Sequence, residues 1–257
     1  MKMSKNTILI TGGASGIGRA LAEALHAQGN LVIIAARRQG LLDQVTEANP
    51  GMKSLRLDIE DALALPRFVK KLLATYPALN VVINNAGVMY DETVAEGNVK
   101  AVEATIATNL LGPIRLTAAL MPHLLAQREA TLINVSSGLA FVPLASAPTY
   151  SATKAAIHSY TQSLRYQLQG TSVQVVELAP PYVQTELQGS QQASDPMAMP
   201  LKDFITEVMN LFRANPQAEE ILVENVKPMR FAETGGNYGG FFKGMNDAVV
   251  AHRKSWH

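Results

Sequence analysis

The chain has 257 residues, of which 47% are hydrophobic and 17% charged, so its composition excludes an intrinsically disordered protein and suits one large α/β domain or two small ones. The net charge is +1 without a basic stripe, so we expect no nucleic-acid partner. With no cysteine, the chain can form neither disulfides nor thiolate metal sites. The apolar run near the N-terminus is too short for a signal peptide, and no stretch reaches membrane-spanning length, so we expect a cytoplasmic protein without a membrane partner.

Six short runs rich in Val, Ile and Leu are predicted to be β-strands. They do not alternate strictly between apolar and polar residues, which is typical of strands buried on both faces of a parallel sheet. The runs lie at 7–11, 31–36, 53–57, 80–84, 131–136 and 173–178.

Helix-like segments separate these runs. An alternation of strands and helices with right-handed crossovers builds a doubly wound sheet. We therefore expect a single α/β domain, in which a Rossmann-like parallel sheet of about seven strands carries helices on both faces. The helices are predicted at 16–28, 41–48, 63–75, 99–127 and 149–168.

The texture of the chain changes near its C-terminal end. Segment 188–200 is polar, small and proline-bearing, which predicts a mobile loop, and 201–212 has the pattern of an amphipathic helix. The glycine-rich run GGNYGGFFKG at 235–244 favours a flexible tail over a site. The only tryptophan, Trp256, is expected to be poorly ordered so close to the terminus.

The first predicted strand runs directly into TGGASGIG at 11–18, and a helix follows. Glycines let the backbone approach a ligand, and the helix start offers free N–H groups to a pyrophosphate. The spacing is T-G-x-x-x-G-x-G, and glycines alone would equally fit an ordinary turn. Because this is the first strand-to-helix turn of a parallel sheet, a dinucleotide site is favoured. Its contacts are predicted at Gly12, Ser15, Gly16, Ile17 and Gly18.

The end of the second strand indicates which dinucleotide binds. An Asp or Glu at this place would accept a hydrogen bond from a free ribose 2′-hydroxyl. Here Ala36 stands instead, and Arg37 and Arg38 follow. Alanine leaves room for a 2′-phosphate, which an arginine can bind with two parallel hydrogen bonds. The sequence therefore predicts that NADP(H) is preferred over NAD(H).

Several further motifs occur in order along the chain. They are NNAG at 84–87, TNLLG at 108–112, NVSSGLAF at 134–141, YSATK at 150–154 and APPYVQTEL at 179–187. Together with TGGASGIG, they resemble the short-chain dehydrogenase/reductase family in its roughly 250-residue form. The segments around SSGLAF, APPYVQT and RFAE most resemble the DltE-type bacterial oxidoreductases. The resemblance implies a cofactor-binding and catalytic core at 6–187, a substrate loop and helix at 188–214, and a C-terminal extension at 215–257.

Tyr150 and Lys154 lie four positions apart on a predicted helix, so they share one face. A carbonyl that accepts hydride develops negative charge on oxygen, and a tyrosine hydroxyl can donate a proton there. A nearby ammonium favours the phenolate and is expected to lower the pKa of the tyrosine. Ser137 ends the fifth strand and can hydrogen-bond the substrate oxygen, with Ser136 as its competitor. The resemblance favours Ser137 over Ser136 and adds Asn109 to the catalytic residues. Without the resemblance, Asn109 would be interpreted as an ordinary asparagine in the middle of a helix.

The resemblance also implies further cofactor contacts. Asp58 and Ile59 would meet the adenine, although Asp58 fits a turn or helix cap nearly as well. A second proline, Pro181, stands where much of the family has glycine, which stiffens this segment. The remaining contacts implied near the nicotinamide are Asn85, Ala86, Gly87, Tyr150, Lys154, Pro180, Val183 and Thr185.

Some residues are left without a firm assignment. Tyr90 fits substrate contact and loop packing equally, and Met197 and Met199 are more typical of loop residues than of a pocket. His158 indicates helix packing or an interface. The histidines form no spaced cluster, so we predict no metal site.

The leading hypothesis is an NADP(H)-dependent oxidoreductase acting on a carbonyl or alcohol of a small molecule. The alternatives are a catalytically silent nucleotide-sensing module of the same fold and a structural scaffold. The long helices 99–127 and 149–168 carry apolar residues more broadly than one sheet-facing stripe requires. Family members pair these helices across a symmetry axis, so we expect a homodimer or homotetramer.

Overall fold

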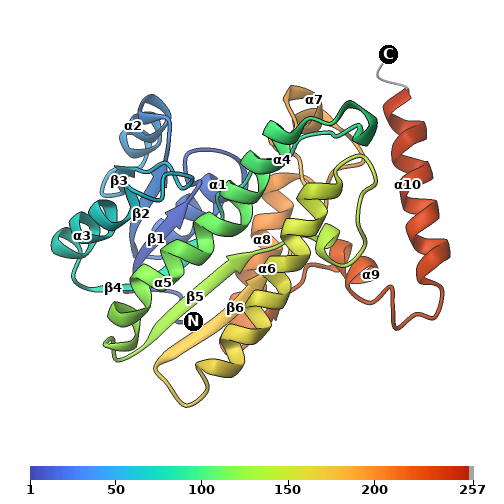
Figure 1. The fold of residues 1–257 in the computed structure, drawn as a ribbon. Helices are drawn as coiled ribbons and strands as arrows, with labels where there is room; N and C mark the ends of the chain where they lie inside the picture. The colour runs from blue at the N-terminus through green and yellow to red at the C-terminus, as the bar shows by residue number, and fades with distance from the viewer. Residues whose placement is uncertain (255–257) are drawn as a thin grey trace.

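The computed structural model describes residues 1–254, with side chains through residue 252, and shows seven parallel strands in one sheet. Trp256 therefore lies outside the described residues. The strand order is β3-β2-β1-β4-β5-β6-β7 (Figure 1). Successive strands are thus added on one side of β1 up to β3 and on its other side from β4 onward. The strands are β1 (Thr7–Thr11), β2 (Leu31–Ala36), β3 (Lys53–Arg56), β4 (Leu79–Asn84), β5 (Ala130–Val135), β6 (Val173–Leu178) and β7 (Glu220–Ile221).

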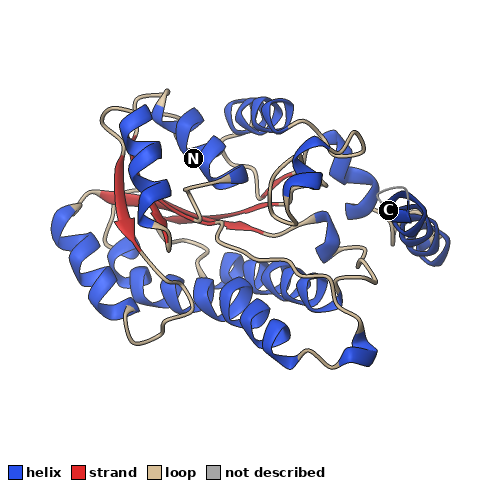
Figure 2. Cartoon of the chain, turned by 90° about the horizontal axis from the view of Figure 1, so that it is seen from above, coloured by secondary structure: helices blue, strands red, loops and turns tan. Residues whose placement is uncertain are grey.

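The expected fold class, a Rossmann-like parallel sheet with helices on both faces, is confirmed (Figure 2). The strands form because their apolar side chains are buried on both sides, as the fully buried β5 shows. One face packs against α1 (Gly16–His26), α2 (Gln39–Ala48) and α8 (Leu201–Ala214). The other face packs against α3 (Leu65–Thr75), α5 (Gly112–Leu125) and α6 (Pro148–Gln167).

The predicted helix at 99–127 is not one regular helix. It consists of α4 (Val99–Ile106), a π-helical turn at Ala107–Leu111 and α5. Within the turn, Asn109 turns its side chain toward the backbone of Val88, accepting from its N–H at 2.9 Å and donating to its carbonyl at 2.9 Å. An inserted residue of this kind occurs in helices at functional sites.

The C-terminal part of the chain is more regular than expected. The loop at 188–200 contains a short helix, α7 (Ser190–Ser194), and is followed by α8. The run at 235–244 is not a flexible tail along its whole length, because α10 (Tyr238–Lys254) begins inside it. A four-residue helix, α9 (Lys227–Arg230), precedes it. Within the described range, no helix has the length and apolarity needed to cross a bilayer.

Candidate active site

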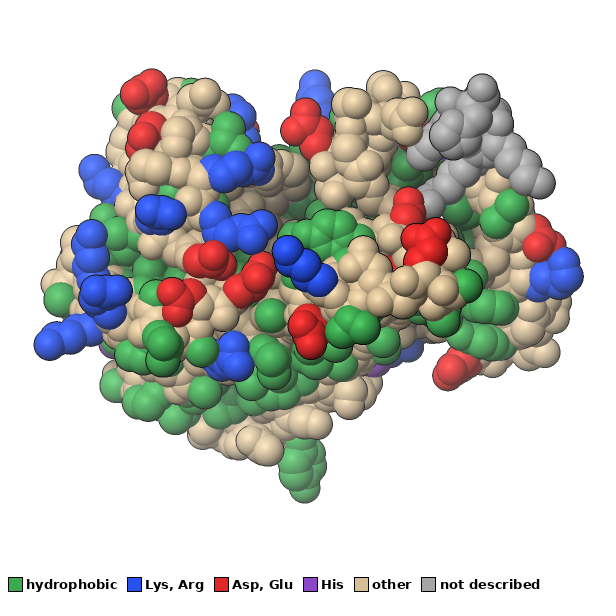
Figure 3. Space-filling model, turned by 45° about the horizontal axis from the view of Figure 1, so that its top comes forward, with side chains coloured by type: hydrophobic (Ala, Val, Ile, Leu, Met, Phe, Trp, Pro, Cys, Tyr) green, Lys and Arg blue, Asp and Glu red, His purple; other side chains and the backbone are tan. Residues whose placement is uncertain are grey.

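A cavity of about 840 Å³ opens at the carboxyl ends of the central strands. In a doubly wound sheet, ligands bind at this edge, where the strand order reverses. Figure 3 shows the molecule hollowed on this side, with Lys and Arg side chains to the left of the hollow and apolar side chains within it.

Most of the residues predicted for the site line this one cavity, although they come from distant parts of the chain. The two that do not line it are Asn109 and Asp58. Those that do are Gly12, Ser15, Gly16, Ile17, Gly18, Arg37, Arg38, Ile59, Asn85, Ala86, Gly87, Ser137, Tyr150, Lys154, Pro180, Val183 and Thr185.

The glycines of the first turn are required by close backbone packing. Gly12 has φ +67°, and a Cβ on it would lie 2.8 Å from the Cα of Ala86. A Cβ on Gly18 would lie 2.3 Å from Nδ2 of Asn85, whose amide donates to the Thr11 carbonyl at 3.0 Å. The turn after β1 is thus bound directly to the end of β4. It leaves bare backbone and the start of α1 facing the cavity, an arrangement that fits a pyrophosphate.

The two arginines lie at the end of β2 and line the same cavity. Arg37 is half-exposed, and its Nη1 lies 3.2 Å from Oε1 of Glu60. The same carboxylate accepts a hydrogen bond from Thr108 at 2.6 Å. Glu60 therefore orients Arg37 at the rim of the cavity, a partner that the sequence analysis did not consider.

Asp58 is exposed, and its carboxylate accepts the backbone N–H of Glu60 at 3.2 Å. This contact belongs to a local turn, the alternative that the sequence left open. Its neighbours Leu57 and Ile59, by contrast, line the cavity.

Ser137, Tyr150 and Lys154 come together at the end of β5 and the start of α6. The Tyr150 hydroxyl is hydrogen-bonded to Ser137, and both side chains are buried. Lys154 Nζ lies 5.6 Å from the centroid of the Tyr150 ring and donates to the Val135 carbonyl at 2.9 Å. The helical spacing of four places Lys154 beside the tyrosine, as the sequence predicts.

Burial dominates the ionisation of this group. It raises the pKa of Tyr150 to about 12, and the hydrogen bond with Ser137 only partly opposes this. It lowers the pKa of Lys154 to about 8, while the negative charge of Glu177 acts in the opposite direction. The expected lowering of the Tyr150 pKa is therefore wrong, because desolvation outweighs the opposing hydrogen bond with Ser137.

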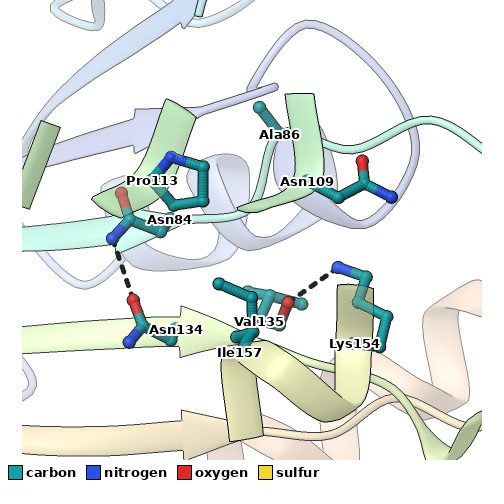
Figure 4. Close-up of a pocket in the computed structure, with 8 residues that line it drawn as sticks. All are labelled: Asn84, Ala86, Asn109, Pro113, Asn134, Val135, Lys154 and Ile157. Atoms are coloured by element: carbon teal, nitrogen blue, oxygen red, sulfur yellow. Dashed lines mark hydrogen bonds between the residues drawn. The ribbon is translucent and has the colours of Figure 1, made fainter. Parts of the chain in front are cut away.

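Asn109 lies behind the main cavity, in a small polar pocket that Lys154 also lines (Figure 4). Figure 4 shows Lys154 reaching toward Val135, and Asn84 facing Asn134 across neighbouring strands. Asn109 Nδ2 also lies 3.3 Å from the Thr153 hydroxyl, which ties the π-helical turn to α6.

A buried carboxylate beneath the site was missed. Glu177 is fully buried in β6, accepting from Ser136 at 2.5 Å and pairing with Nδ1 of His158 at 2.7 Å. The sequence does contain a signal for this site: Glu177 is a charged residue in a mostly apolar strand, and a charge in a strand covered on both faces needs buried partners. Ser136, the competitor of Ser137, is thereby engaged away from Tyr150.

Among the described residues, His158, Glu177 and Glu220 bring three side chains together that could hold a metal ion. Each already has a partner within the chain. Glu220 binds Arg230 through two hydrogen bonds of 2.9 and 3.0 Å, and His158 also packs edge-on against Phe141 at 5.0 Å. The guanidinium thus supplies the positive charge that the carboxylates require.

The C-terminal helix contributes a wall that the sequence analysis did not find. Met245, Val249 and His252 of α10 line the cavity together with Asp195. His252 Nε2 lies 3.0 Å from Oδ2 of Asp195, which also accepts from the Tyr182 hydroxyl at 3.0 Å. Burial favours the neutral form of Asp195, but hydrogen bonds from Met197 N–H, Tyr182 and His252 hold its pKa below the ordinary value.

The sequence left Tyr90, Met197 and Met199 unassigned, and the structure places the first two in the cavity and the third in the core. Tyr90 and Met197 line the cavity. Met199 instead packs against the core under α8, and its backbone pairs with Val183.

Known proteins resemble this chain in sequence and in fold. The short chain dehydrogenase family model matches residues 6–196. The uncharacterized oxidoreductase DltE of Bacillus subtilis (strain 168) is 39% identical over 251 residues, which cover 96% of this chain and 98% of that protein.

Two solved structures share the fold. A short chain dehydrogenase/reductase from Burkholderia phymatum in complex with NAD has a TM-score of 0.79 and 22% identity, covering 91% of this chain and 92% of that one. A serine dehydrogenase complexed with NADP+ has a TM-score of 0.74 and 26% identity, covering 80% and 88%. Since the family model covers most of the chain, and the Bacillus relative is similar along nearly all of it, the chain belongs to the short-chain dehydrogenase/reductase family of NAD(P)-dependent oxidoreductases, in its DltE type.

Proposed function

We propose that this oxidoreductase prefers NADP(H) and interconverts a carbonyl and an alcohol, with Tyr150 as the general acid and base. One observation carries the proposal: Ser137, Tyr150 and Lys154 meet in the same cavity as the glycine turn. A nicotinamide cofactor bound there supplies or accepts the hydride.

The chain's own residues handle the proton and the charge. In the reducing direction, the Tyr150 hydroxyl gives its proton to the substrate oxygen as that oxygen gains charge, and the carbonyl becomes an alcohol. Ser137 orients the same oxygen by hydrogen bonding. The protonated Lys154 stabilises the phenolate left on Tyr150, which solvent then reprotonates. Asn109 is proposed to position Lys154 from behind, through the pocket that the two share.

The cofactor preference is supported by the end of β2. Ala36 leaves space there, and Arg37 and Arg38 line the cavity without a carboxylate at the ribose position. An arginine fork binds a phosphate with two parallel hydrogen bonds, whereas a free ribose hydroxyl gains little from it. Both cofactors occur among the structural neighbours, so this preference rests on the chain's own residues.

The remaining roles follow the same arrangement. We assign residues 6–187 to cofactor binding and catalysis, 188–214 to the substrate loop and helix, and 215–257 to the C-terminal extension. Asn85, Ala86 and Gly87 are proposed to approach the cofactor by their backbone. Pro180, Val183 and Thr185 are proposed to meet the carboxamide, with Asp58 and Ile59 near the adenine.

A screen tests the function. The full chain is incubated with NADPH and a panel of aldehydes and ketones, and in the reverse direction with NADP+ and alcohols that include serine, which a structural neighbour is named for. Turnover of at least one member is expected. Cofactor binding without any turnover would favour the nucleotide-sensing module, and the lack of binding would favour the scaffold.

A further inference from the structure

The surroundings of Tyr150 are apolar on the side away from the glycine turn. Tyr150 belongs to a small hydrophobic cluster with Met89, Leu144 and Ala147, against which Leu139 and Val249 also pack. We call this side of the cavity the apolar half and define it by the lining residues Met89, Leu139, Leu144, Met229, Met245 and Val249. Three of the six are methionines, whose flexible side chains adapt to apolar groups of different shapes.

The charged residues that line the cavity do not belong to the apolar half as defined. They are Arg37, Arg38, Lys154, Glu186 and Asp195. Arg37 and Arg38 lie at the end of β2, and Lys154 donates to the Val135 carbonyl. Asp195 is bound by Tyr182 and His252. Among the described side chains, the apolar half thus offers no lysine or arginine to a carboxylate or phosphate. Burying an unpaired anion there would carry a large desolvation penalty.

Helix α10 forms the outer wall of the apolar half. Met245, Val249 and His252 are spaced by four and three residues, so they lie on one face of the helix, and all three line the cavity. Two polar anchors hold this face inward. Asn246 accepts from the Ala145 N–H at 2.7 Å and donates to the Pro143 carbonyl at 3.2 Å, while His252 binds Asp195 of the substrate loop.

From these observations we infer that the substrate is a neutral ketone or aldehyde with an apolar body, or the corresponding alcohol. Its apolar body lies between Met89, Leu144 and the inward face of α10, and its oxygen lies at Ser137 and Tyr150. The inference rests on the proposed function and adds the substrate class. Apolar burial drives binding, and the two anchors of α10 hold this wall in place beside the cavity.

A matched pair of substrates tests the class. The full chain with NADPH is assayed on para-methylacetophenone and para-acetylbenzoate, and on the corresponding pair of benzaldehydes, which differ only in a methyl or a carboxylate. We expect kcat/KM to favour the neutral member by about tenfold or more. Equal or better turnover of the anionic members would overturn the inference. Turnover of no carbonyl, neutral or anionic, would instead count against the proposed function.

A pair of variants tests the wall. Val249→Lys places a cation inside the apolar half, whereas Val250→Lys places one on the neighbouring position, which is 54% exposed and does not line the cavity. For Val249→Lys we expect kcat/KM to fall for the neutral ketone and to rise for its carboxylate analogue. The affinity for NADPH, measured by fluorescence titration, should stay unchanged. Val250→Lys should leave the ratio of the two kcat/KM values, neutral ketone to carboxylate analogue, as it is in the unmutated protein. The same ratio in both variants would show that α10 does not border the substrate.

Discussion

Tyr150 and Lys154 lie one helical turn apart on α6, and burial moves their pKa values apart, to about 12 for the tyrosine and about 8 for the lysine. At neutral pH the tyrosine is therefore protonated and the lysine still carries its charge. This combination suits the proposed carbonyl reduction, in which the tyrosine gives up a proton and the lysine stabilises the phenolate that remains. Oxidation would instead require the phenolate first.

The sign of the pH dependence follows for reduction. Lys154 is cationic below its pKa of about 8 and loses its charge as pH rises through that value. The support for the forming phenolate is then lost, so kcat for reduction should fall above about pH 8. In Lys154→Arg the charge persists, and the alkaline limb should move to higher pH. A pH profile of kcat at saturating cofactor measures the alkaline limb in both proteins. An alkaline limb at the same pH in the two proteins would show that Lys154 is not the group that titrates.

Arg37 offers a second test at the scale of single residues. Binding of NADPH should be at least about tenfold tighter than that of NADH, because a phosphate gains a charge-assisted hydrogen bond. Arg37→Ala should narrow this gap. Glu60→Gln, which removes the ion-pair partner but keeps the arginine, should preserve or widen it. Fluorescence titration measures the affinities, and equal affinity of the unmutated protein for both cofactors would refute the preference.

At the scale of elements, the interruption between α4 and α5 connects the helix to the site. Asn109 bridges both backbone groups of Val88, just after the NNAG segment, and its amide also reaches Thr153 on α6. A single side chain thus ties together three segments that surround Lys154. The π-helical turn is the backbone arrangement that accompanies this inward side chain.

Removing that side chain should cost stability. Asn109→Ala removes the partner of both partly buried backbone groups of Val88, so we expect the free energy of unfolding to fall by about 1–3 kcal/mol. Asn98→Ala, at the exposed start of α4, removes a helix cap and should cost only about 1 kcal/mol. Urea denaturation of both variants compares them. A smaller loss for Asn109→Ala than for Asn98→Ala would contradict the bridging role.

The features that the sequence predicted best are those determined by a local pattern, namely the strands and the glycine turn. The strands at 7–11, 31–36 and 173–178 appear with the predicted bounds, because a continuous apolar run flanked by turn residues has few alternatives in a buried sheet. The glycine turn was predictable for the same reason. The break at Ala107–Leu111 was not, because the apolar period continues through it.

What the sequence could not predict depends on distant partners. His252 and Asp195 are 57 residues apart, so no local pattern joins them. Helix α10 was hidden by its glycines, although Met245 and Val249 already stand at helical spacing. The ion pair of Arg37 with Glu60 likewise depends on the pairing of β2 with β3, which brings the two chain segments together.

At the scale of the whole molecule, α5 and α6 cover one face of the sheet (Figure 1). Each helix also exposes a large apolar or aromatic side chain. Leu125 is 44% exposed and Tyr166 76% exposed at their C-terminal ends. We predict that these helices pair with those of other copies in a homodimer or homotetramer. Light scattering at micromolar concentration should give a multiple of the chain mass, and a monomer would contradict the prediction.

The proton transfer by Tyr150 is the central claim, and the turnover of Tyr150→Phe tests it most directly. The variant keeps the ring but loses the hydroxyl, so kcat should fall by about two to four orders of magnitude, while NADPH affinity stays nearly unchanged. Tyr166→Phe, on the exposed surface of the same helix, serves as the control and should retain full activity. Undiminished turnover of Tyr150→Phe would remove Tyr150 from the acid role.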